Sequence, residues 1–191
     1  MKRIETNLPG VCIIEPDVHG DDRGFFMESY NARDFEELGI NCMFVQDNHS
    51  RSQRGVIRGL HYQLAQPQAK LVRVMFGEVY DVAVDVRRGS ETFGQWAAVT
   101  LSAENKQMLF VPEGFAHGFC VISEFAEFAY KCSDFYAPAA ERGIIWNDPE
   151  LAIGWPLGDA APILSPKDAA YGLLSAMSES DLPVCQKGAG Q

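Results

Sequence analysis

The sequence has few basic residues and no long apolar run, and each shortage excludes a class of protein. Its 191 residues include 16 Lys and Arg against 26 Asp and Glu, a formal net charge of −10 at pH 7. An acidic surface repels phosphate backbones and anionic lipid, so we expect neither a nucleic acid nor a membrane as partner. No run approaches the about 20 apolar residues that span a bilayer. The basic N-terminus lacks the apolar stretch of a secretory signal.

Paired cysteines and the common catalytic motifs are also missing. The five cysteines are scattered, and none stands in a CxxC pair. This usage is typical of buried thiols in a reducing compartment, so we expect a cytoplasmic protein. The chain has no glycine-rich phosphate loop, no GxSxG motif and no HExxH motif. The chain therefore lacks the motifs that usually mark nucleotide-loop enzymes, serine hydrolases and zinc proteases.

Short strands dominate the sequence between residues 55 and 136. Apolar alternation and turn residues predict strands at 72–76, 79–86, 96–101, 107–111, 119–122 and 125–131. An asparagine N-cap, acidic residues and a stop glycine predict one helix within 31–39. This pattern predicts a mainly β fold, an antiparallel double-sheet jelly roll with a few short flanking helices. We expect one domain over 1–175 and a polar, loosely ordered tail over 176–191.

Positive charge is concentrated in one short segment, RSQRGVIRGLHYQ at residues 51–63. It holds three arginines and His61 within an acidic chain, which suits the binding of an anion. Gly55 and Gly59 flank Arg58 and would let a ligand approach the backbone. A solvated edge loop with a satisfied histidine explains the same residues equally well.

The segment PEGFAHGF, which contains His117, matches the second metal-binding signature of the cupin barrels. The first cupin signature is HxH followed by Glu, but here Gln63 stands two residues after His61. With four histidines in the whole chain, a site of nitrogen and oxygen ligands is short of ligands. The pattern therefore favours the barrel without a metal, and His117 alone is also consistent with a turn histidine.

Three further segments are ordinary when each is taken alone. Lys70 is typical of a gatekeeper charge, which stands beside an apolar strand and opposes aggregation. Tyr130 is typical of core packing in a strand rich in aromatic residues. SPKD at residues 165–168 is typical of a solvated helix start.

Together and in order, these segments resemble the dTDP-4-dehydrorhamnose 3,5-epimerase family of cupin-like jelly rolls. The resemblance extends from about residue 10 to residue 170 through DDRGFFME, QDNHSRSQRGVIRGLHYQ, QAKLVRV, GEVYDVAVDVRRGSETFGQW, VPEGFAHGF, EFAYKCSDFYAP, GIIWNDP and LSPKD. It implies an isomerase of rhamnose and carbohydrate biosynthesis that uses no metal, nicotinamide or flavin. The implied reaction inverts C3 and C5 of dTDP-4-dehydro-6-deoxy-D-glucose through enolates and gives dTDP-4-dehydro-L-rhamnose.

The resemblance also implies a role for each of four catalytic residues. His61 would remove the proton next to the C4 ketone, and Asp168 would fix the tautomer of its imidazole. Lys70 would stabilise the enolate oxygen, and Tyr130 would return a proton from the opposite face.

The remaining matches imply contacts with a dTDP-sugar in a homodimer. Arg58 would hold the diphosphate, and His117 would donate a hydrogen bond near the C4 ketone. An exchanged N-terminal strand would carry Arg23, Phe26 and Glu28 into the neighbouring subunit's site. The other implied contacts are Gln46, Asn48, Tyr136, Glu141 and Lys167.

Three alternatives stay open. Relatives that invert a single carbon, C3 or C5, share the same motifs. A metal-dependent cupin enzyme would bind iron, zinc or manganese and lose activity to a chelator, and Gln63 argues against it. A non-catalytic sugar-nucleotide binding module would bind dTDP without exchanging sugar protons with solvent.

Overall fold

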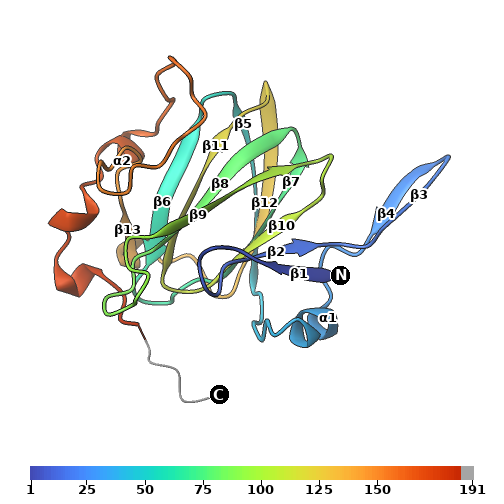
Figure 1. Cartoon of the computed structure of the whole chain (residues 1–191), viewed down its shortest axis with the longest axis horizontal. Helices are drawn as coiled ribbons and strands as arrows, with labels where there is room; N and C mark the ends of the chain where they lie inside the picture. The colour runs from blue at the N-terminus through green and yellow to red at the C-terminus, as the bar shows by residue number, and fades with distance from the viewer. Residues whose placement is uncertain (186–191) are drawn as a thin grey trace.

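Two antiparallel sheets face each other in the computed structural model, which describes residues 1–185 (Figure 1). The first sheet has six strands in the order β1 (Lys2–Glu5), β2 (Cys12–Glu15), β10 (Met108–Val111), β7 (Lys70–Phe76), β12 (Phe125–Cys132) and β5 (Gln46–Gln53). The second has five strands in the order β13 (Glu141–Gly143), β6 (Ile57–Gln63), β11 (Phe115–Val121), β8 (Glu78–Asp85) and β9 (Trp96–Ser102). A separate hairpin consists of β3 (Val18–Asp21) and β4 (Gly24–Met27). The prediction of a mainly β double-sheet fold is confirmed.

The helices are short and lie beside the sheets. They are α1 (Ala32–Glu37), α2 (Pro166–Ala169) and the 3-10 turns Pro138–Ala140, Leu174–Ala176 and Glu179–Asp181. The predicted cap of α1 is present, since the Asn31 side chain accepts a hydrogen bond from the Arg33 amide. None of the helices within residues 1–185 is both long and apolar enough to cross a membrane.

The apolar core lies between the two sheets. Val72 and Phe128 from the six-stranded sheet are buried against Val79 and Phe119 from the five-stranded sheet. On strand β8 the predicted alternation is present, but both faces are buried. Val82 and its alternate neighbours point away from this core into a second apolar cluster beneath the C-terminal segment.

Strand β5 was not predicted, because QDNHSRSQ contains no apolar residue. Its side chains alternate nonetheless. Asn48 and Ser50 point into a cavity between the sheets, while Asp47 and His49 on the alternate positions are exposed. A polar cavity on one side and water on the other remove the apolar periodicity that marks a half-buried strand.

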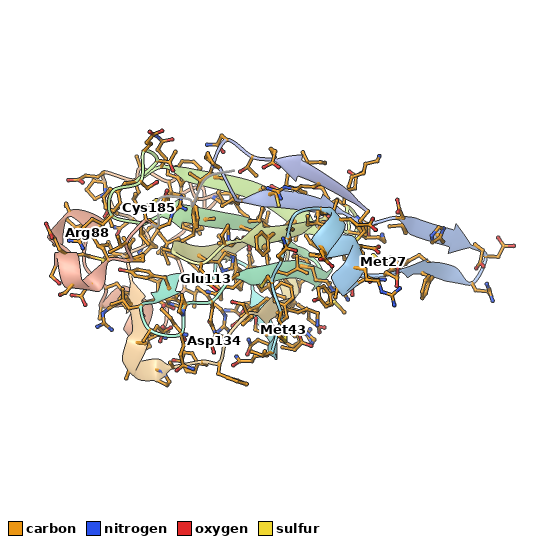
Figure 2. The ribbon with its side chains drawn as sticks, turned by 90° about the horizontal axis from the view of Figure 1, so that it is seen from below. Met27, Met43, Arg88, Glu113, Asp134 and Cys185 are labelled. Atoms are coloured by element: carbon orange, nitrogen blue, oxygen red, sulfur yellow. The ribbon has the colours of Figure 1, made fainter. Side chains whose placement is uncertain are left out.

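The C-terminal segment through Cys185 lies along the five-stranded sheet, where a loosely ordered tail was expected. Tyr62 on β6 donates a hydrogen bond to the Asp181 carbonyl at 2.7 Å, and Arg142 donates to the Asp181 carboxylate at 2.6 Å. The Cys185 amide donates to the Arg88 carbonyl, and both residues lie at the end of the barrel opposite the hairpin (Figure 2). The division at residue 175 stays a prediction, and the rest of the expected tail, 186–191, lies outside the described residues.

Candidate active site

A cavity of about 720 Å³ opens between the two sheets. Its walls come from β5, β6, β7, β11, β12, β13 and α2, so segments far apart in sequence meet there. Apart from three residues of the N-terminal hairpin, every residue predicted for the site lines it. These are Gln46, Asn48, Arg58, His61, Lys70, His117, Tyr130, Tyr136, Glu141, Lys167 and Asp168.

His61 and Asp168 form a hydrogen-bonded pair. Strand β6 carries His61, and its Nε2 lies 2.5 Å from Oδ1 of Asp168 in helix α2. The Ser165 side chain caps α2 and also donates to Asp168, which is 3% exposed. Burial alone would raise the pKa of Asp168, but the hydrogen bonds from His61 and Ser165 lower it below its ordinary value. An ionised carboxylate only accepts, so the neutral imidazole donates from Nε2 and keeps its lone pair on Nδ1.

Lys70 and Tyr130 lie on the opposite sheet from His61, on β7 and β12. Burial raises the pKa of the Tyr130 phenol, which therefore stays protonated at neutral pH. Burial lowers the pKa of the Lys70 amine, an effect opposed by Cys132, Glu141 and Asp81. Within the described residues no acceptor pairs with the Lys70 ammonium. The cavity thus places the His61 imidazole on one wall and the Tyr130 phenol and the Lys70 amine on the other.

A second histidine–carboxylate pair stands beside the first. His117 pairs with His61 in the β6–β11 register, and its Nε2 lies 2.8 Å from Oδ1 of Asp81. Strand β11 begins at Phe115, four residues before the predicted start, so His117 lies in a strand and not in a turn. Burial raises the pKa of Asp81, although its electrostatic interaction and hydrogen bond with His117 act to lower it. The pair orients the second imidazole towards the cavity.

Three charged or polar groups meet beside the His61 ring. Lys167 and the Tyr136 hydroxyl both donate to Glu141, at 2.8 Å and 2.9 Å. Burial alone would raise the pKa of Glu141, but these hydrogen bonds lower it below its ordinary value. Its Oε1 lies 3.9 Å from His61 Nδ1, so the imidazolium formed on proton uptake meets a negative charge.

The anion-binding expectation for Arg58 fits its position at the cavity. Its Nε donates to the Ser52 hydroxyl at 3.1 Å, and no carboxylate within residues 1–185 forms a salt bridge with it. The guanidinium therefore keeps donors for a ligand.

Two glycines of this segment have reasons in the fold itself, while the expectation that they let a ligand approach the backbone stays a prediction. A Cβ on Gly59 would lie 2.5 Å from the Gly118 Cα of the neighbouring strand β11, and Gly59 has a φ of +125°. Gly55 has a φ of +78° and lies in the turn before β6. The close approach of β6 and β11 requires the first glycine, and a turn requires the second.

The Gln63 side chain is hydrogen-bonded to two loops, the one after β6 and the one after β12. Its amide nitrogen donates to the carbonyls of Gln66 and Phe135, and its oxygen accepts from the Ala137 amide. The residues of the chain that the structure describes contain no cluster of three His, Cys, Asp or Glu side chains arranged to hold a metal ion.

Arg23, Phe26 and Glu28 do not reach the cavity of their own chain. They lie on and next to the β3–β4 hairpin, which projects from the barrel with Met27 at its base (Figure 2). Phe25 is 61% exposed and Phe26 is 68% exposed.

Several residues in or near the cavity were not predicted from the sequence. Asp81 lies in the strand predicted at 79–86 and no role was predicted for it, although a carboxylate among valines and alanines signals a polar interior. The cavity is further lined by Ser50, Tyr62, Gln63, Gln68, Phe119, Phe128, Ser165 and Pro166.

The profile of a protein family, described as dTDP-4-dehydrorhamnose 3,5-epimerase, matches residues 5–176. This chain belongs to that family. A dTDP-4-dehydrorhamnose 3,5-epimerase of Pseudomonas aeruginosa is 64% identical over 169 residues, which cover 88% of this chain and 93% of the relative.

Solved structures of relatives have the same fold. A dTDP-6-deoxy-D-glucose-3,5-epimerase from Legionella pneumophila, in complex with dTDP-4-keto-L-rhamnose, superposes with a TM-score of 0.94 at 57% identity. The match covers 97% of this chain and 98% of that structure. A 3'-monoepimerase from Streptomyces bikiniensis, in complex with dTDP-quinovose, has a TM-score of 0.87 at 35% identity, with 93% and 91% of the two chains covered. The fold thus accompanies both double and single epimerisation.

Proposed function

We propose that this protein is an epimerase that inverts C3 and C5 of dTDP-4-dehydro-6-deoxy-D-glucose, giving dTDP-4-dehydro-L-rhamnose. One observation carries the proposal: the His61–Asp168 pair faces Tyr130 and Lys70 across a single cavity. The family of the chain and its 64% identical relative support the same substrate. The protons on C3 and C5 flank a ketone, so one base, one acid and one oxyanion site suffice for both centres.

His61 is the proposed base. With Nε2–H donated to Asp168, its Nδ1 lone pair accepts the proton from C3 or C5. The C–H bond breaks, and its electron pair forms the enolate on the C4 oxygen. Asp168 and Glu141 both stabilise the imidazolium that results.

Lys70 is the proposed partner of the enolate oxygen. Among residues 1–185 no anion lies within hydrogen-bonding distance of its ammonium, so it gains its strongest interaction when the C4 oxygen becomes negative. An interaction that strengthens in the transition state accelerates the chemical step. His117 donates to the same oxygen or to a neighbouring hydroxyl in this proposal.

Tyr130 is the proposed acid. It lies on the sheet opposite His61, so its phenol reaches the other face of the sugar ring. It donates its proton to the carbanion carbon, which inverts that centre. The Tyr130 phenolate then takes up a proton from solvent, and the His61 imidazolium releases its proton to solvent. Both groups thereby return to their starting protonation states.

The nucleotide half of the substrate is held by polar residues of the cavity. Arg58 pairs with the diphosphate through its free guanidinium donors. The remaining proposed contacts of this chain are Gln46, Asn48, Tyr136, Glu141 and Lys167.

Turnover in D₂O tests the reaction. We expect deuterium at both C3 and C5 of the product, since each proton is removed and replaced from solvent, and NMR measures both positions. Label at one carbon alone would identify a single-centre epimerase. Binding of dTDP without any label would identify a binding module. A rate lost to a chelator and restored by iron, zinc or manganese would identify a metal-dependent enzyme.

We further propose a cytoplasmic homodimer with exchanged N-terminal hairpins. The hairpin β3–β4 pairs with no other strand of residues 1–185, and its two phenylalanines are exposed, although an isolated hairpin is marginally stable in water. A second copy of the chain that covers these rings would receive Arg23, Phe26 and Glu28 at its cavity. Phe26 would then stack on the thymine of the dTDP-sugar bound there. Cys12, Cys42, Cys120 and Cys132 are thiols, as in a reducing compartment.

Mixed dimers test the exchange. One subunit carries Arg23→Ala and Glu28→Ala, the other carries His61→Asn, and two affinity tags select the heterodimer after co-expression. If the hairpins are exchanged, one site of the mixed dimer combines an intact His61 with an intact hairpin. We therefore expect about half of the wild-type activity from the mixed dimer, although each homodimeric variant has low activity. If each hairpin served its own chain, both sites would stay defective and the mixed dimer would be as weak as its parents.

A further inference from the structure

Tyr171 contacts His61 without lining the cavity. The two rings meet in a T-shaped arrangement, with centroids 5.6 Å apart and planes at 65°. Tyr171 follows α2, three residues after Asp168. The same short segment therefore supplies both the carboxylate that binds Nε2 of His61 and an aromatic ring that packs against the imidazole.

Gly143 makes room for this ring. It pairs with His61 in the β6–β13 register, so a side chain at position 143 would stand next to the imidazole. A Cβ added at Gly143 would lie 2.4 to 2.6 Å from three ring carbons of Tyr171. The Tyr171 ring thus occupies the space that a side chain on Gly143 would take.

The backbone on both sides of Tyr171 is fixed by hydrogen bonds. Before it, the Ala170 amide donates to the Lys167 carbonyl at 3.1 Å. After it, Gly172 bridges to Ile144, and the Ile145 amide donates to the Gly172 carbonyl at 2.9 Å. These two anchors direct the ring towards Gly143 and His61.

We propose that Tyr171 is a positioning residue for His61 and that Gly143 is the position that admits it. The role rests on the proposed function, in which His61 removes the sugar protons. The Asp168 hydrogen bond restrains Nε2 but leaves the imidazole plane free to tilt about it. A ring packed against the imidazole restricts that tilt and keeps Nδ1 directed at the reacting carbon, where a misplacement of about 1 Å costs rate steeply.

The hydroxyl of Tyr171 has no part in this role. Burial raises the pKa of this phenol to about 12, with Glu141 adding to the rise and Lys167 opposing it. The phenol is therefore neutral near pH 7, and the aromatic ring alone provides the contact.

Two substitutions separate the ring from the hydroxyl. We expect Tyr171→Phe to keep the wild-type kcat and Tyr171→Ala to lower kcat by about tenfold or more. KM should stay nearly unchanged because Tyr171 does not line the cavity. Equal losses in both variants would assign the effect to the hydroxyl and overturn the proposal. Parallel losses of kcat, dTDP affinity and melting temperature in Tyr171→Ala would also overturn it, in favour of a purely structural role.

Gly143→Ala gives a matched test, because the nearest atoms to the added methyl all belong to Tyr171. The single variant displaces the ring, and we expect it to lower kcat as Tyr171→Ala does. The Tyr171→Ala background lacks the three ring carbons that the methyl would meet first, so the double variant should be no slower than Tyr171→Ala. Additive losses in the double variant would contradict the proposed pairing.

Nitrogen-15 NMR of the His61 ring provides a readout that does not depend on turnover. We expect one ordered tautomer with the proton on Nε2 in the wild type and in Tyr171→Phe, and averaged ring signals in Tyr171→Ala. Unchanged signals together with an unchanged kcat in Tyr171→Ala would overturn the positioning role and leave the proposed function intact. Absence of deuterium uptake by the wild type would instead refute the function, while the ring signals would still test the contact.

Discussion

Replacement of His61 by asparagine is expected to remove deuterium uptake at both C3 and C5 while dTDP still binds. Asparagine fills similar space but has no basic lone pair, so the proton next to the ketone has no acceptor. Loss of a general base costs about 10²- to 10⁴-fold in rate. The measurement is NMR of substrate incubated with the variant in D₂O at saturating concentration.

His49→Asn provides the matched control. His49 is exposed on the outer face of β5, where its Nε2 lies 3.4 Å from Glu127, and it does not line the cavity. We expect wild-type exchange at both carbons from this variant. Exchange at either carbon that persists in His61→Asn would assign proton removal at that carbon to another group. A loss of dTDP binding would mean that the variant disturbs the cavity and not the base alone.

Lys70→Met is expected to have the next largest effect, a loss of about 10²- to 10³-fold in kcat, the range measured when a single oxyanion donor is removed. Methionine preserves the length of the side chain and removes its charge. The enolate oxygen then develops its charge against an apolar group, with the carboxyl groups of Asp81 and Glu141 near position 70. Because Lys70 acts mainly on the transition state, KM should change far less than kcat.

Lys2→Met serves as the control for this loss of charge. Lys2 lies on the edge strand β1 of the same sheet, with its ammonium 3.6 Å from Glu15 in an exposed pair. Such a pair contributes little, so activity and melting temperature should stay at wild-type values. A Lys70→Met enzyme with wild-type kcat would exclude Lys70 from enolate stabilisation. Raised KM with unchanged kcat would reassign it to substrate binding.

The two histidine–carboxylate pairs, His61–Asp168 and His117–Asp81, differ in how far the sequence predicted them. The resemblance of SPKD to the family's motif implied that Asp168 binds His61. In the structure, Nε2 of His61 lies 2.5 Å from Oδ1 of Asp168. No motif pointed to Asp81 as the partner of His117, since the residues are 36 positions apart and meet only through the β8–β11 pairing. Local patterns report on neighbours along the chain, whereas a cross-strand pair depends on the register between strands.

Periodicity determined most of the barrel. The strands over residues 70–132 were predicted because apolar residues alternate there, and α1 was predicted from its cap, because these signals are local. The motifs together identified the family and most residues of the cavity. Composition led to the expectation of neither a nucleic-acid nor a membrane partner, because 26 acidic residues oppose 16 basic ones, and that expectation stays a prediction.

Only the tertiary structure decided the rest. Strand β5 has no apolar pattern because it faces a polar cavity, and Gly59 is required by a neighbouring strand that the sequence does not place beside it. The contact of Tyr171 with His61 depends on the bridge between Ile144 and Gly172, which joins segments 28 residues apart. Such contacts depend on which segments distant in sequence pair side by side, and that pairing leaves no periodic trace in the chain.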